Sequence, residues 1–114
     1  MIVLRHNRRM HFVGIGGIGM CAIAELLHTL GFSVSGSDRE ESAITRRLSS
    51  LGIGVQIGHN PELIAGSDVV VYSSAVRPDN PELLYAREHG ITLVKRAEVQ
   101  GEIMRTRFSI GVSG

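Results

Sequence analysis

The chain has 114 residues, 43% of them hydrophobic, which predicts one globular domain with a small core. Twelve basic and eleven acidic residues are scattered and give a formal net charge of +1, so the composition argues against nucleic-acid binding. We expect no membrane partner, because no apolar run approaches the roughly 18 residues that a spanning helix needs, and no signal-peptide pattern is present.

Residues 1–9 hold the only basic cluster, and we expect them to form a flexible, solvated arm ahead of the first strand. The single cysteine, Cys21, cannot form an internal disulfide and lies in an apolar segment, so we expect a small core residue and not a nucleophile. A lone cysteine favours a reducing compartment, and we expect the protein to be cytoplasmic.

An apolar run predicts the first strand, and Gly14, Gly16 and Gly19 follow it in G-x-G-x-x-G spacing. The first glycine permits a tight turn into a helix, the second lets the backbone approach a pyrophosphate, and the third lets helix and strand pack closely. We expect Gly16 to have a positive φ angle. Backbone amides at the helix start then hold an anion, although glycines also serve turns that bind nothing.

Apolar residues at three- and four-residue spacing predict a helix over residues 19–30, and residues 32–38 form a second strand that ends in Asp38. A dinucleotide fold places a carboxylate at this point against a ribose hydroxyl. Helix capping is the alternative, because Ser37, Asp38 or Ser42 could each begin the helix predicted over residues 44–51.

The remaining segments keep the alternation of strand and helix, which predicts an α/β fold: a Rossmann-like, doubly wound, mainly parallel five-stranded sheet with helices on both faces. We expect strands at residues 54–58, 68–73 and 91–94, a short helix at 61–65, and helices at 80–88 and 97–105. A last strand is expected at residues 108–112, as the start of a further unit.

Ligands of an open α/β sheet lie beyond the carboxyl ends of its strands. Ser73 and Ser74 end the strongest strand there and can donate to a phosphate or a base, although serine is also an ordinary turn residue. Lys95 and Arg96 leave the next strand at the same end, where either could approach an anion or remain solvated. No complete Walker sequence, metal-spaced His/Cys set or nucleophile–base pair occurs, so we expect no catalytic residue, metal or cofactor site.

Several motifs together closely resemble the amino-terminal part of the Mur ligases of peptidoglycan synthesis, in the branch that adds L-alanine to UDP-N-acetylmuramate. The motifs are HFVGIGGIGM at residues 11–20, SGSD at 35–38, YSSAV at 72–76, NPE at 80–82, RAE at 96–98 and IGVSG at 110–114. The resemblance implies a UDP-substrate-binding domain at residues 10–106 and the start of a central domain at 107–114, whose ATP loop begins just after Gly114. It also implies a parent enzyme that uses ATP and Mg²⁺ to make an acyl phosphate, which L-alanine attacks; we expect the 114 residues alone to be inactive.

The same resemblance implies which residues contact the UDP group of UDP-N-acetylmuramate. They are Ile15, Gly16, Gly17, Ile18, Gly19 and Met20 at the diphosphate, Ser37 and Asp38 near the uridine, Ser73, Ser74, Ala75 and Val76 closing the crevice, and Arg96. His59 is either a contact on the uracil side or a surface turn residue.

Two other functions remain open at this point. An NAD(P)-binding domain of an oxidoreductase or of a ligand-sensing module explains the glycines and Asp38 equally well, but not residues 72–76. The recycling Mur ligase, which attaches a whole peptide to UDP-N-acetylmuramate, would bind the same nucleotide, although its glycine loop usually departs from the GIGGIG pattern seen here.

Overall fold

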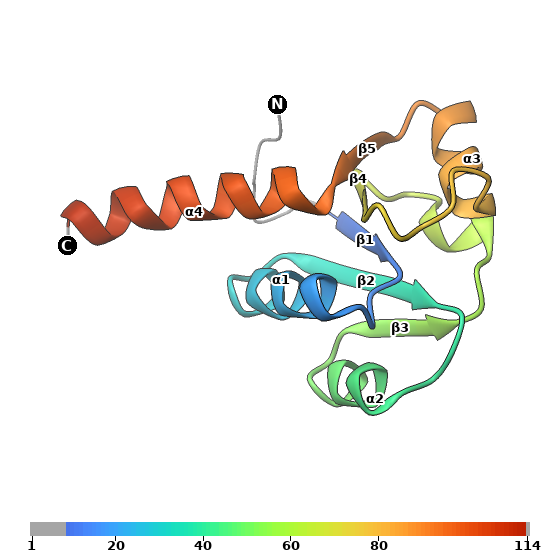
Figure 1. Cartoon of the computed structure of the whole chain (residues 1–114), viewed down its shortest axis with the longest axis horizontal. Helices are drawn as coiled ribbons and strands as arrows, with labels where there is room; N and C mark the ends of the chain where they lie inside the picture. The colour runs from blue at the N-terminus through green and yellow to red at the C-terminus, as the bar shows by residue number, and fades with distance from the viewer. Residues whose placement is uncertain (1–8, 114) are drawn as a thin grey trace.

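Five parallel strands form one sheet in the order β3-β2-β1-β4-β5 (Figure 1). The strands are β1 (Arg9–Val13), β2 (Ser33–Asp38), β3 (Gly54–Ile57), β4 (Val69–Tyr72) and β5 (Thr92–Lys95). The computed structural model describes the backbone of residues 9–113 and the side chains of residues 9–104. The strand order changes direction between β1 and β4, and this switch point is where α/β sheets bind ligands.

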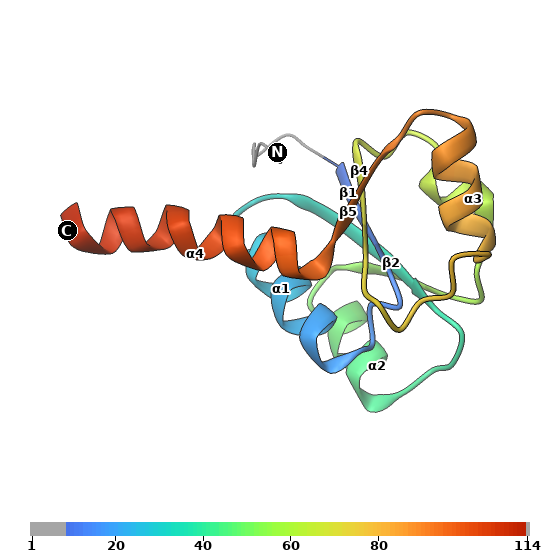
Figure 2. The same ribbon diagram turned by 45° about the horizontal axis from the view of Figure 1, so that its top comes forward.

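Helices cover both faces of the sheet, as predicted. Helices α1 (Ile18–Thr29), α2 (Ala43–Ser50) and the first turns of α4 (Arg96–Ser113) pack on one face, and their buried side chains form one core with the sheet. Helix α3 (Pro81–Glu88) and the 3₁₀ helix η1 (Pro61–Ile64) share a smaller core on the other face (Figure 2). Burial on both faces explains why β4 is an unbroken apolar run.

Helix α2 shows which residue at the end of β2 acts as a cap. The hydroxyl of Ser42 accepts a hydrogen bond from the amide of Thr45, while the Thr45 hydroxyl accepts one from the amide of Ser42. This reciprocal pair is a capping box, which satisfies two amides that a helix start otherwise leaves without partners. Ser42 is therefore the cap, and Ser37 and Asp38 are left for other contacts.

The strand predicted at residues 108–112 is wrong, because helix α4 continues through this segment to Ser113. A strand needs a neighbouring strand to accept and donate its backbone hydrogen bonds, whereas a helix satisfies them internally. The end of α4 extends away from the sheet in both views (Figures 1 and 2), so this segment has no strand beside it. The start of a second domain at residue 107 stays a prediction.

Residues 1–8 of the predicted arm lie outside the described residues, and β1 begins at Arg9.

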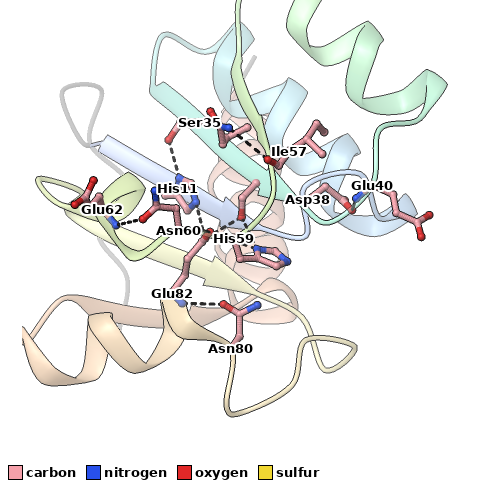
Figure 3. Close-up of polar contacts among 12 residues, drawn as sticks. His11, Ser35, Asp38, Glu40, Ile57, His59, Asn60, Glu62, Asn80 and Glu82 are labelled. Carbon is pink, nitrogen blue, oxygen red and sulfur yellow. Dashed lines mark hydrogen bonds and ion pairs between the residues drawn. The ribbon is translucent and has the colours of Figure 1, made fainter.

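A buried carboxylate connects the sheet to α3 (Figure 3). The Glu82 side chain is fully buried and accepts hydrogen bonds from His11 Nε2 at 2.9 Å, from the Ser37 hydroxyl at 2.8 Å and from the Asn60 amide at 3.0 Å. The other nitrogen of His11 lies 3.0 Å from the hydroxyl of Ser35. These contacts join β1, β2, the segment before η1, and α3.

The contacts keep Glu82 ionised in spite of its burial. Burial alone raises the pKa of Glu82, but the hydrogen bond and charge of His11 lower it, together with the bonds from Ser37 and Asn60. The net pKa of Glu82 is below its ordinary value of 4.5. A carboxylate that is satisfied by several donors is stabilising only while those donors are present.

Gly36, at the centre of β2, is required by close packing with the loop that follows β1. A Cβ atom placed on Gly36 would lie 2.5 Å from Cδ1 of Ile15 and 2.9 Å from the carbonyl oxygen of Phe12. Real Cβ atoms do not approach other atoms so closely, so Ile15, itself fully buried, would have to move. The glycine thus lets Ile15 fill the core directly beneath the loop.

We predict that Gly36→Ala destabilises the domain by about 1–3 kcal/mol, the usual cost of overpacking a core. Urea unfolding followed by circular dichroism measures the change. Gly54→Ala is the matched control in the neighbouring strand, because its Cβ would meet nothing nearer than 4.0 Å and the position is exposed. Equal stability of the two variants would show that the Ile15 contact does not constrain position 36.

We also predict that Glu82→Gln costs about 2–4 kcal/mol at pH 7 and progressively less in acid. The folded-state pKa of Glu82 is lowered, so its contribution is complete above the unfolded-state value near 4.5 and is lost as the pH falls through the folded-state pKa. Urea unfolding of both proteins between pH 7 and pH 3 measures the difference. The exposed Glu88→Gln serves as control. A difference that stays constant or grows toward acid would contradict the assignment.

Candidate functional site

The carboxyl ends of all five strands meet at one edge of the sheet, and a cavity of about 770 Å³ opens there between the glycine loop and the segments after β2, β3 and β4. Its lining residues are Gly14, Gly16, Gly17, Asp38, Arg39, Glu40, Ser42, His59, Ser73, Ala75, Val76, Arg77, Asp79, Asn80 and Pro81. This position agrees with the rule that ligands bind at the switch point of an open sheet.

The glycine loop is anchored to the end of β2 by its backbone. The amides of Gly14 and Ile15 both donate to the carbonyl of Ser37, at 2.8 and 2.9 Å, and the amide of Gly17 donates to the carbonyl of Gly14. Gly14 has a φ of +78°, which side-chain-bearing residues rarely adopt. The expectation of a positive φ at Gly16 is therefore wrong, because the chain makes its tight turn two residues earlier.

The start of α1 has the features of an anion-binding site. Gly17 is the N-cap and has no side chain to accept the first amides, and the first turn contains no acidic residue. The amides of Ile18, Gly19 and Met20 belong to that turn, where a helix provides no acceptor of its own. Together with the positive end of the helix dipole they favour a negatively charged ligand.

Asp38 holds the second glycine of the motif. Its Oδ2 atom accepts a hydrogen bond from the amide of Gly16 at 2.8 Å. A Cβ on Gly16 would lie 2.7 Å from this same oxygen and 3.1 Å from Cγ2 of Thr45. Gly16 thus allows the loop to lie against β2 and α2, and Asp38 stabilises the loop as well as lining the cavity.

The third glycine makes room for Arg96, the first residue of α4. A Cβ on Gly19 would lie 2.9 Å from Cδ and 3.1 Å from Nε of Arg96, so the arginine side chain lies across the start of α1. Its guanidinium donates to the side chain of Gln100 at 2.6 Å, and no ion pair joins it to a carboxylate within the described residues. A cation is therefore positioned beside the free amides of the helix.

The other predicted contacts divide into three groups. His59, Ser73, Ala75 and Val76 line the cavity with Gly16, Gly17 and Asp38, as expected for residues that share one site. The side chains of Ile15 and Met20 are buried in the core, and Ser37 lies fully buried beneath the loop, so these side chains do not face the cavity. Ile18 is 85% exposed, and Ser74 is exposed but is not part of the lining.

Sequence reasoning did not find several residues of this site. Arg39 follows Asp38 directly, so its position at the edge of the sheet could have indicated it. Arg77 and Asp79 line the cavity from the loop between β4 and α3. Glu82 belongs to the NPE motif of the resemblance but was given no role, since nothing in the local sequence shows that its side chain turns inward to meet His11.

His59 connects the cavity to the buried network. Its ring lines the cavity, with the side chain 21% exposed, and its Nδ1 lies 3.0 Å from the hydroxyl of Ser37 and 3.3 Å from Oε2 of Glu82. The alternative of a solvated turn histidine does not describe this position, because one edge of the ring is held by two buried partners (Figure 3).

Two negative observations concern the described residues only. No group of three histidine, cysteine or acidic side chains among them is arranged to hold a metal ion. No helix in the described part of the chain combines the length and the apolar character needed to cross a membrane.

Residues 9–108 match the family described as "Mur ligase family, catalytic domain". Over 107 residues the chain is 54% identical to a UDP-N-acetylmuramate–L-alanine ligase of Sorangium cellulosum, an alignment that covers 94% of this chain and 23% of that protein. A similar relative from Aromatoleum aromaticum is 53% identical over 112 residues, which are 97% of this chain and 24% of that protein. The chain thus spans about a quarter of the length of these relatives.

The fold is similar to that of a UDP-N-acetylmuramate-alanine ligase from Thermotoga maritima, with a TM-score of 0.83 and 37% identity over 86% of this chain and 23% of the other. A UDP-N-acetylmuramate:L-alanyl-gamma-D-glutamyl-meso-diaminopimelate ligase from Neisseria meningitides gives a TM-score of 0.73 and 25% identity over 79% of this chain and 29% of that one. The family match covers most of the chain, and the resemblance inferred from the glycine loop is confirmed. The chain belongs to the Mur ligase family.

Proposed function

We propose that this chain binds the UDP group of UDP-N-acetylmuramate and presents that substrate to an ATP-dependent ligase reaction with L-alanine. The observation that carries the proposal is the start of α1, where the amides of the first turn have no acceptor within the helix, Arg96 lies against Gly19, and the preceding Gly16 and Gly17 line a cavity of about 770 Å³. The names of the relatives that match over 94–97% of this chain supply the substrate.

The chemistry of the site suits a diphosphate. A helix start binds an anion through amides whose geometry is already set, so little ordering is needed when the ligand arrives. Arg96 adds a planar cation that can donate two parallel hydrogen bonds to phosphate oxygens. The nucleoside would then extend from the loop past Asp38, which is bonded to the loop, toward His59; both residues line the cavity.

We infer that the role of the chain in the whole enzyme is to orient the lactyl carboxylate of the substrate. Phosphorylation of this carboxylate by ATP and attack of the L-alanine amine on the acyl phosphate are reactions in which positioning supplies much of the rate. ATP, Mg²⁺ and L-alanine would be engaged by parts of the parent protein beyond these 114 residues. A cytoplasmic location is consistent with these partners and with the unpaired Cys21.

The relatives favour the alanine-adding ligase over the two alternative functions. The family match over residues 9–108 and the names of the relatives argue against an NAD(P)-binding domain, whereas the position of Asp38 suits either kind of nucleoside. The peptide-recycling ligase is similar in fold, but the solved structure of that class is 25% identical to the chain with a TM-score of 0.73, against 37% and 0.83 for the solved alanine ligase.

We predict that UDP and UDP-N-acetylmuramate bind to the chain more tightly than NAD or NADP, by about tenfold or more. The glycine loop alone does not select among these ligands, so the preference must come from the cavity between Asp38 and His59. Isothermal titration calorimetry with the four compounds in one buffer measures it. Tighter binding of NAD or NADP would overturn the proposed function.

We also predict that Arg96→Gln weakens UDP binding by about tenfold, which corresponds to roughly 1.4 kcal/mol for a charged hydrogen bond. Lys95→Gln is the matched control, because Lys95 is the neighbouring cation and its residue is exposed. Gly19→Ala should cause a similar loss, since its Cβ would displace the arginine side chain.

The two substitutions act through one side chain, so their effects should not add in the double variant. Calorimetric affinities at low and moderate salt test this, and the unfolding midpoints of the variants show whether they remain folded. Equal losses from Lys95→Gln and Arg96→Gln would indicate only a general charge effect and would remove Arg96 from the site.

A further inference from the structure

The network around Glu82 determines where the proton of His59 lies. Glu82 is ionised and can only accept hydrogen bonds, and its Oε1 lies 2.8 Å from the single hydroxyl of Ser37. That hydroxyl has one proton, which is donated to the carboxylate. The Ser37 oxygen can then only accept from the other atom within reach, His59 Nδ1 at 3.0 Å.

The opposite assignment leaves two unfavourable contacts. If Nδ1 of His59 had no proton, its lone pair would face Oε2 of Glu82 at 3.3 Å. The hydroxyl of Ser37 would have to turn toward His59, and its oxygen would then face Oε1 of Glu82 at 2.8 Å without a proton between them. Buried acceptors that face each other are costly, so the proton belongs on Nδ1.

His11 completes the arrangement from the other side of the carboxylate. Its Nε2 must donate to Glu82, and its Nδ1 is 3.0 Å from the hydroxyl of Ser35. Together with the amide of Asn60, the donors to Glu82 come from β1, β2 and the segment that carries His59. These donors hold the carboxylate in place, so its Oε2 atom faces Nδ1 of His59 and favours a proton on that nitrogen.

A neutral imidazole with its proton on Nδ1 has a lone pair on Nε2. Nδ1 is turned inward to the network, while the ring lines the cavity and is 21% exposed. We propose that Glu82 is a positioning residue that keeps the proton of the neutral His59 ring on Nδ1, so that Nε2 accepts a hydrogen bond from the bound nucleoside.

This inference rests on the proposed function and specifies what the same cavity requires of its ligand. The nucleoside must offer a proton, and in uridine the donors are the imide N–H of the base and the ribose hydroxyls. The imide N–H and a ribose hydroxyl can each donate a hydrogen bond to the uncharged Nε2 of His59. A histidine with its proton on Nε2 could not accept a hydrogen bond from either of them.

The tautomer is measured directly in the unaltered, ¹⁵N-labelled chain. Long-range ¹H–¹⁵N correlation spectra show which ring nitrogen carries the proton, and His59→Ala identifies the signals of His59. We expect the Nδ1–H form at a pH where the ring is neutral. Glu82→Gln should shift the ring toward the Nε2–H form, which free histidine favours, whereas Glu88→Gln on the same helix should not. A main Nε2–H form in the unaltered chain would overturn the proposal, and this measurement does not depend on whether Glu82→Gln folds.

The acceptor role is tested with analogues of UDP in calorimetric titrations. The 3-methyl analogue lacks the imide proton, the 2′,3′-dideoxy analogue lacks the ribose hydroxyls, and the 5-methyl analogue is the control that retains both. We expect one of the first two to bind the unaltered chain about three- to tenfold more weakly than UDP, as for one lost hydrogen bond. Which analogue is affected identifies the donor.

The loss should disappear in His59→Ala, which removes the acceptor, and shrink in Glu82→Gln, which leaves less of the ring in the form that accepts at Nε2. A loss that persists in His59→Ala, or analogues that all bind like UDP, would overturn the inference while leaving UDP binding intact. Failure of the unaltered chain to bind UDP at all would overturn the proposed function and this role of His59 with it.

Discussion

Ser37 connects the two halves of this site with its backbone and its side chain. The carbonyl accepts the amides of Gly14 and Ile15, which holds the glycine loop against the end of β2. The hydroxyl donates to Glu82, which holds α3 and the segment of His59 against the same strand. Movement of this one residue would displace the glycine loop and the ring of His59 together, so the rest of the arrangement depends on it.

The cavity has two different kinds of polar group: the backbone amides at the start of α1 and the ring of His59, which is held by Ser37 and Glu82. At the start of α1 the attraction for an anion comes from backbone amides and from Arg96, which Gly19 allows to lie close. At His59 the buried carboxylate of Glu82 sets the direction of a hydrogen bond and does not touch the ligand. Both devices are built before the ligand arrives, which reduces the free energy lost to ordering on binding.

Each of the three glycines of the motif is required for a different structural reason. Gly14 takes a backbone conformation with positive φ, Gly16 lies against Asp38, and Gly19 lies against Arg96. Only the first is a requirement of the turn itself. Gly16 and Gly19 are needed because side chains 22 and 77 positions later in the chain lie too close for a Cβ atom. Two of the three glycines in the G-x-G-x-x-G pattern are therefore explained by tertiary contacts.

Sequence alone determined the strands and helices of the sheet, its parallel α/β class and the glycine turn after the first strand, because these follow from local patterns. Apolar periodicity distinguishes strand from helix, and glycine spacing marks the turn between β1 and α1. It failed at residues 108–112, where β-branched and aromatic residues predict a strand but no neighbouring strand is present to pair with. Only the tertiary structure decided the contacts of Arg96 and the inward direction of Glu82. A side chain's charge can be read from the sequence, but the partner that satisfies it is set by which distant segments the sheet brings together.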